Sequence, residues 1–339
     1  MDWDRARELF RRSQRGDRLT AGEQEYLDRA KALRRRQSAA GGVAAERQRR
    51  PPERLIPMPD LGPGEHYEGE DGGLYGEGRN VPVGGHLEAA RVALGGIEPR
   101  DSAGRPDAGG RIGFISISMS NATQEFSRFK QIADGAPEKS LRVVIVDCAQ
   151  GGQAMAEWAP PDARPWQVAM QRLSASNLST AQVQVAWIKL ANKGPSGSFK
   201  EHGEKLLQDT RQVLENAKRR FPHLRVVYLG SRIWAGNARG GLNPEPYAYE
   251  SGFVVRWLIQ RQARGEEALA TDKVPLLLWG PYLWAEGKRG RRQDDLVWAP
   301  GDFAADGVHP AASGREKVAR LLLDFVTTDP LARPWFTGR

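Results

Sequence analysis

The sequence predicts an α/β protein of three layers, in which helices cover both faces of a five-stranded parallel sheet. Three observations favour this fold class. The chain has 339 residues, 40% hydrophobic and 27% charged, which is enough to bury a large core. From residue 111 onward, short apolar runs alternate with helix-like segments. Their spacing is typical of right-handed βαβ crossovers, which make neighbouring strands parallel.

Residues 1–50 predict a basic helical hairpin. Helices are expected at 3–15 and 20–36, and Thr20 and Glu23 have the spacing of a capping box. This segment holds 14 Lys/Arg against 8 Asp/Glu, whereas the other 289 residues hold 36 against 34. The net charge of +8 therefore belongs mostly to the hairpin, and it does not favour nucleic-acid binding by the rest of the chain.

Residues 51–110 are interpreted as a Gly/Pro-rich linker and loop region. The linker runs over 37–65 and is followed by a glycine-dense loop at 72–80. A phosphate cradle needs a strand before such a loop and a helix after it, and neither is clear, so a lid or rim is favoured. A short helix is expected at 85–95, before a second loop at 95–110.

Residues 111–339 are expected to form the main domain. The predicted strands are 112–117, 141–146, 183–188, 224–229 and 274–279. The predicted helices are 121–133, 165–175, 199–220, 246–264 and 313–327. Ligand sites of open parallel sheets lie beyond the carboxyl ends of the strands, so the residues that follow each strand are the candidates for chemistry.

A serine follows the first strand, in the run Ser118-Met119-Ser120-Asn121-Ala122-Thr123. A serine at a strand-to-helix turn exposes its hydroxyl at the sheet edge, and its N–H points with the helix N-terminus toward a developing oxyanion. The alternative is that Ser118, Ser120 or Thr123 only caps the helix.

Asp306 and His309 stand directly before the last expected helix. An aspartate three residues before a histidine can hold the imidazole by Nδ1 and stabilise it once it is protonated. Of the other four histidines, His66 and His86 fall in the loop-rich region, and His202 and His223 are expected on helix surfaces. His309 is therefore the candidate general base.

Together these motifs resemble those of the SGNH (GDSL) hydrolases. Ser118-Met119-Ser120 resembles the first block of that family, with Ser118 and Met119 in place of the usual Gly and Asp and with Ser120 at the nucleophile. Asp306 and His309 match the D-x-x-H of the fifth block. The resemblance covers residues 111–327 and implies a flavodoxin-like sheet, a Ser-His-Asp triad, and neither metal nor organic cofactor.

The resemblance also implies an oxyanion hole. The second block corresponds to residues 147–153, where Gly152 fits the oxyanion glycine best and Gly151 less well. The third block corresponds to residues 187–192 and offers Asn192 as an oxyanion donor. Because that block lacks its usual glycine, Lys189 is the alternative polar group.

The activity that follows is hydrolysis of a small-molecule or carbohydrate ester. Aromatic residues mixed with Arg, Asn and Glu near the strand edge suit a sugar and favour O-acetyl groups on carbohydrate as substrate. The candidate substrate-binding residues are Arg232, Asn243, Glu245 and Tyr282. Two alternatives remain open: a non-catalytic SGNH-like carbohydrate-binding module, and a nucleic-acid-associated protein acting through the basic N-terminus.

Composition limits the remaining possibilities. No run approaches the roughly 20 apolar residues of a membrane span. The first residues lack the apolar segment of a signal peptide, so a cytoplasmic protein, or an exported one that has lost its leader, is expected. Cys148 is the single cysteine, which excludes an internal disulfide and suggests a buried thiol. No metal cluster is indicated.

Overall fold

The computed structural model describes residues 54–338, residues 19–33, and positions 2, 5, 6, 8, 9 and 12. Contacts within the chain divide it into two units, Met1–Arg50 and Pro51–Arg339.

In the N-terminal unit, the described positions 5, 6, 8, 9 and 12 are helical, as are residues 21–33. Glu23 accepts hydrogen bonds from the N–H and the hydroxyl of Thr20, and Thr20 accepts one from the Glu23 N–H. The predicted capping box is therefore present. Arg12 contacts Glu23 at 2.7 Å, which joins the two helical segments. The ends of the two expected helices, at 3–4, 13–15 and 34–36, lie outside the described residues.

The second unit is built on a five-stranded sheet in which every pairing is parallel, with the order β2-β1-β3-β4-β5. The strands are β1 (Ile112–Ile117), β2 (Val143–Asp147), β3 (Val183–Lys189), β4 (Val226–Gly230) and β5 (Leu276–Trp279). The chain places β2 on one side of β1 and then places β3, β4 and β5 on the other side, so the order in which strands are added reverses between β1 and β3. Such a switch point opens a crevice at the carboxyl ends of the strands.

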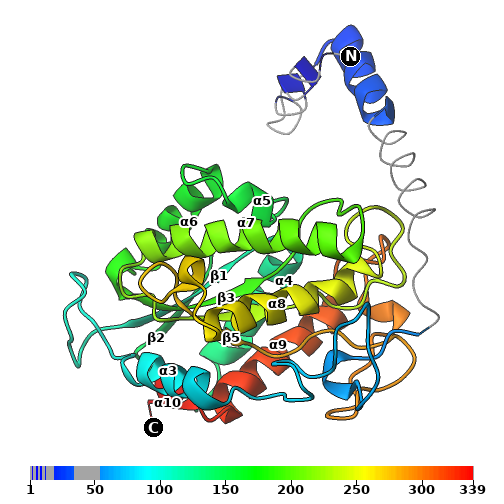
Figure 1. Cartoon of the computed structure of the whole chain (residues 1–339). Helices are drawn as coiled ribbons and strands as arrows, with labels where there is room; N and C mark the ends of the chain where they lie inside the picture. Colours follow the sequence, from blue (N-terminus) through cyan, green and yellow to red (C-terminus); the bar gives the residue numbers. More distant parts are fainter. Residues whose placement is uncertain are drawn as a thin grey trace. The chain divides into compact units, whose positions relative to one another are not determined.

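Helices cover both faces of the sheet, as Figure 1 shows. One face carries α3 (Gly84–Gly95), α4 (Ser120–Asp134), α9 (Ala312–Thr328) and α10 (Arg333–Thr337). The other face carries α5 (Met155–Trp158), α6 (Arg164–Ala175), α7 (Phe199–Arg220) and α8 (Tyr247–Ala263). Short 3₁₀ turns lie at Met58–Asp60, Thr180–Gln182, Glu267–Leu269 and Pro300–Asp302. The predicted three-layer α/β fold is confirmed.

The observed strand bounds differ slightly from the predicted ones for local reasons. Leu141 is 96% exposed and lies in the turn before β2, so an apolar residue there does not mark the strand. Pro275 has no N–H to donate to the sheet, and β5 begins only at Leu276.

Residues 54–80 pack against the helices and sheet of the second unit, to which they belong, although the sequence predicted a linker and a rim there. Met58 is fully buried, and the Trp279 indole donates to the Leu74 carbonyl at 2.6 Å. The Arg256 guanidinium of α8 contacts Glu70 and Asp71. This segment is therefore a strap fixed to α8 and β5. The part of the expected linker at 37–53 lies outside the described residues.

Candidate active site

Ser120 is the first residue of α4, immediately beyond the carboxyl end of β1. Met119 before it is extended, and no side chain caps the helix. An uncapped helix start leaves backbone N–H groups and the positive end of the helix dipole available to a negative charge. The sequence alternative, a serine or threonine that only caps the helix, does not describe this turn.

Ser120, His309 and Asp306 form one chain of hydrogen bonds. Ser120 Oγ lies 2.8 Å from His309 Nε2, and His309 Nδ1 lies 2.5 Å from Asp306 Oδ2. The aspartate fixes the tautomer, because Nδ1–H donates to the carboxylate and leaves Nε2 as the acceptor for the serine hydroxyl. All three side chains are partly exposed, so a substrate could reach them.

The turn from Asp306 to His309 is held by its own backbone. Asp306 Oδ1 accepts the N–H groups of Val308 and His309, both at 3.0 Å. Burial raises the pKa of Asp306, but these hydrogen bonds and the imidazole outweigh it and hold that pKa below its usual value. Gly307 has φ +70°, and a Cβ there would lie 1.9 Å from the Asn237 carbonyl oxygen. Only glycine satisfies both conditions.

Asn121 connects the serine and histidine segments. Its buried side chain donates to the Val308 carbonyl at 2.8 Å. It therefore fixes the start of α4 against the turn that carries His309. No local sequence pattern singles out this residue, because its partner lies 187 positions away.

Ser118 occupies the position where the resemblance would place a glycine. Its hydroxyl donates to the Lys189 carbonyl at the end of β3, and its carbonyl accepts the Gln150 N–H at 2.9 Å. The residue thus joins the ends of three strands. This accounts physically for a serine in the first block.

The loop after β2 presents Gly152 at the surface with φ +73°. Its start is held by Ser116, whose hydroxyl donates to Asp147 at 2.5 Å and accepts the Ala149 N–H. Arg172 donates to the carbonyls of Asp147 and Ala149, both at 2.8 Å. Burial raises the pKa of Asp147, and the hydroxyl groups that bond it oppose the effect. This loop is fixed before any ligand arrives.

Asn192 and Lys189, the two candidates in the third block, form hydrogen bonds within the fold that the sequence did not predict. The Asn192 Oδ1 accepts the Ala156 N–H of α5 at 2.9 Å, and its Nδ2 donates to Asp209 at 2.6 Å. One Nδ2 hydrogen remains for a ligand, because an amide nitrogen carries two. Lys189, the alternative, is fully buried and places Nζ 2.6 Å from both carboxylate oxygens of Glu125.

Glu125 of α4 and Lys189 at the end of β3 form an ion pair in which both side chains are fully inaccessible. Burial raises the pKa of Glu125 and lowers that of Lys189 to about 8, and each partner opposes the shift of the other. A lysine in the apolar run of β3 was the sequence signal for this pair.

The four candidate substrate residues differ in their surroundings. Asn243 donates to the Asn192 carbonyl at 2.7 Å. The Glu245 carboxylate accepts the Ala235 and Tyr249 N–H groups and the Trp284 indole N–H. The Tyr282 hydroxyl is buried and accepts the Met58 N–H. The polar side-chain groups of these three residues are bonded to other parts of the protein, whereas the Arg232 guanidinium has no hydrogen-bond partner among the described residues.

His202 is not on the surface, which corrects the expectation from the helix pattern. It is 7% exposed, and its Nε2 lies 2.5 Å from Glu250 Oε2. The strap and α8 cover the side of α7 that the pattern assigned to solvent. This arrangement depends on segments distant in sequence.

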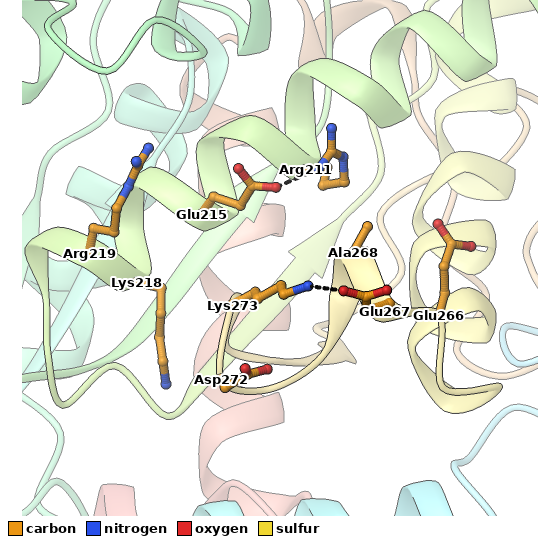
Figure 2. A pocket seen from close by; sticks show the side chains of 9 residues that line it. All are labelled: Arg211, Glu215, Lys218, Arg219, Glu266, Glu267, Ala268, Asp272 and Lys273. Carbon is orange, nitrogen blue, oxygen red and sulfur yellow. Dashed lines mark hydrogen bonds and ion pairs between the residues drawn. The ribbon is translucent and has the colours of Figure 1, made fainter.

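A surface hollow of about 820 Å³ lies away from the serine, between the carboxyl half of α7 and the turn before β5. Figure 2 shows it lined by charged side chains, among them the pairs Arg211 with Glu215 and Lys273 with Glu267. These segments precede β4 and β5, so the hollow is on the amino-end side of the strands. Positive and negative charges balance there, and it favours no single class of ligand.

In the part of the chain that the structure describes, no helix is both long and apolar enough to span a membrane. Nor is any group of three or more His, Cys, Asp or Glu side chains placed to hold a metal ion.

No family model matches the sequence, and no curated protein is significantly similar to it. One similar solved structure is a protein from Bacteroides fragilis NCTC 9343 that its description proposes to be an acylhydrolase. It has a TM-score of 0.35 and 13% identity, over 74% of this chain and 100% of that one. Another is a gut microbial diltiazem-metabolizing enzyme, with a TM-score of 0.37 and 14% identity, over 66% of this chain and 47% of that one. Likeness of this size carries no conclusion about function.

Proposed function

We propose that this protein is a serine hydrolase of carboxylic esters. The observation that carries the proposal is the continuous hydrogen-bond chain from Ser120 through His309 to Asp306 at an uncapped helix start. A hydroxyl, a neutral imidazole and a carboxylate in this order form the arrangement that activates serine for acyl transfer.

In the proposed reaction, Ser120 Oγ attacks the ester carbonyl carbon while His309 Nε2 takes its proton. The tetrahedral intermediate collapses to an acyl-serine when the C–O bond to the alcohol breaks, and the imidazolium gives its proton to the leaving oxygen. Water then attacks the acyl-serine by the same route and releases the acid. Asp306 holds the imidazole and stabilises its charged form.

The oxyanion would lie at the start of α4. The proposed donors are the backbone N–H groups of Ser120 and Gly152, with the free Nδ2 hydrogen of Asn192 as a third. Loss of one such donor typically lowers turnover by about 10²–10³-fold. O-acetyl groups on carbohydrate remain the proposed natural esters, and acetate release from acetylated sugars tests that finer assignment.

The test uses a short-chain aryl acetate and a fluorophosphonate probe. Ser120→Ala and His309→Ala should each lower kcat by about 10³-fold or more, as in other serine hydrolases, and Ser120→Ala should abolish labelling. Ser127→Ala is the matched control, since Ser127 lies on the same helix but donates to Asp147. A wild-type protein that neither turns over the ester nor takes the label would contradict the proposal.

A further inference from the structure

Arg232 is a buried arginine whose guanidinium has no partner among the described residues. The residue is 2% exposed, and its Nε is enclosed without a hydrogen bond. The other buried arginines, Arg100, Arg256 and Arg291, each contact a carboxylate. Arg232 alone in this group forms no ion pair, and an unpaired buried charge is strongly unfavourable in a folded protein.

Arg232 belongs to the loop that packs against the proposed triad. This loop follows β4, and its Arg239 N–H donates to the Asp306 carbonyl at 2.9 Å. The Asn237 carbonyl lies against Gly307 in the same turn. The guanidinium is close enough to interact electrostatically with Asp306. Its positive charge therefore lies near the place where the ester would react.

The carboxylates around Arg232 are already engaged by other groups. Glu125 is bonded through both oxygens to Lys189, and Asp306 is bonded to His309. Glu245 accepts three hydrogen bonds from other donors. None of these three carboxylates forms a hydrogen bond or an ion pair with Arg232, although all three favour its charged form electrostatically. The N–H groups of the guanidinium therefore have no bonded partner in the described chain and remain available to a further anion.

We propose that Arg232 recognises a carboxylate carried by the ester substrate. This inference rests on the proposed hydrolase function and narrows its substrate class. A guanidinium presents N–H groups in a planar fork that matches the two oxygens of a carboxylate. An acylated sugar acid, or another ester with a free carboxylate close to the scissile bond, meets this requirement.

A competing role for Arg232 is stabilisation of the oxyanion. The two roles differ in what they predict for neutral substrates. An oxyanion donor acts on every ester equally, whereas a carboxylate-binding residue acts on charged esters only. The ratio between a charged and a neutral ester therefore separates them.

The experiment compares 3-acetoxybenzoate with its methyl ester. Both release acetate from a phenol, and they differ in one carboxylate. A charge-assisted hydrogen-bonded contact corresponds to about 10- to 100-fold in binding, so wild-type kcat/KM should favour the acid by that factor, chiefly through KM. Arg232→Met should bring the ratio to about one, and Arg232→Lys should restore part of it because it keeps the charge.

Arg256→Met is the matched control, since Arg256 is equally buried but paired with the strap. In this variant, the ratio of kcat/KM for the acid to kcat/KM for the methyl ester should stay at the wild-type value. If Arg232→Met does not fold, inhibition of methyl-ester hydrolysis in the wild type gives the answer, and 3-hydroxybenzoate should inhibit at least about tenfold more strongly than 3-hydroxybenzamide. Equal inhibition, or a wild-type ratio near one, overturns the inference while leaving the esterase intact. No turnover of either ester refutes the hydrolase function itself.

Discussion

Removal of Lys189 alone should destabilise the protein strongly. Lys189→Met leaves the Glu125 carboxylate fully buried without the ammonium that now lies 2.6 Å from both its oxygens. Breaking one half of a buried ion pair typically costs about 3–5 kcal/mol in the free energy of unfolding. Arg232 interacts electrostatically with Glu125 but forms no ion pair with it, so it compensates for only part of this loss.

The loss of stability in Lys189→Met should depend on pH in a defined direction. Burial already raises the pKa of Glu125, and removal of Lys189 removes the main opposing charge. The folded variant then binds a proton over a pH range in which the unfolded chain has lost it. Its stability is therefore greatest below the unfolded pKa of Glu125 and falls as pH rises through the folded one.

A double-mutant cycle, followed by urea unfolding, measures the interaction free energy of Glu125 and Lys189. Glu125→Leu combined with Lys189→Met removes both charges, and such apolar replacements are often neutral or stabilising by about 1–4 kcal/mol relative to the ion pair. The reasoning would be refuted if Lys189→Met alone cost less than about 1 kcal/mol, the value expected of an exposed pair. It would also fail if the double variant were less stable than the single one.

Three other predictions each concern a single residue. Gly307→Ala should lower esterase activity and the Tm together, because it places a Cβ 1.9 Å from the Asn237 carbonyl at φ +70°; full activity with an unchanged melting curve would contradict the proposed packing. Burial raises the pKa of Glu245 to about 7, so its ionisation should lower stability as pH rises from 4.5 to 7, by at most about 3 kcal/mol. Glu245→Gln should flatten that part of the pH profile of urea unfolding, and an unchanged slope would rule Glu245 out as its source. Burial raises the pKa of the Cys148 thiol, so a thiol reagent should label native protein far more slowly than urea-unfolded protein, and equal rates would place Cys148 at the surface.

The sheet and its helices were predictable because their information is local. Buried strands such as Val183–Lys189 are nearly continuous apolar runs, and helices such as Phe199–Arg220 keep a helical period and a serine cap. The strap at 54–80 has no such period. Its conformation depends on Arg256 and Trp279, about 200 positions away, and no local pattern records those contacts.

The candidate site divides in the same way. Ser120, Asp306 and His309 could be selected because strand ends and spacing bring them to one edge of the sheet, and the structure places them within hydrogen-bonding distance. Asn121 could not be selected, since its importance comes from the Val308 carbonyl that it reaches. The sequence could not exclude Glu245 and Tyr282 as substrate-binding residues either. Residues of these types are common in sugar sites, but whether a polar side chain faces a ligand or a neighbouring backbone depends on tertiary packing.

Which polar side chains around the triad are bonded to one another, and which are not, therefore says more about ligand binding than the residue types alone. Polar groups that hold this region together are bonded to one another, as Asp147 is to Ser116 and Glu125 is to Lys189. A fold tolerates an unbonded buried charge only at a thermodynamic cost, and such costs persist mainly where function needs them. If Arg232 were structural, Arg232→Met would destabilise the protein as other core changes do. If it serves a ligand, the same substitution relieves an unpaired charge, so it should leave the Tm unchanged or raise it while the preference for carboxylate esters disappears.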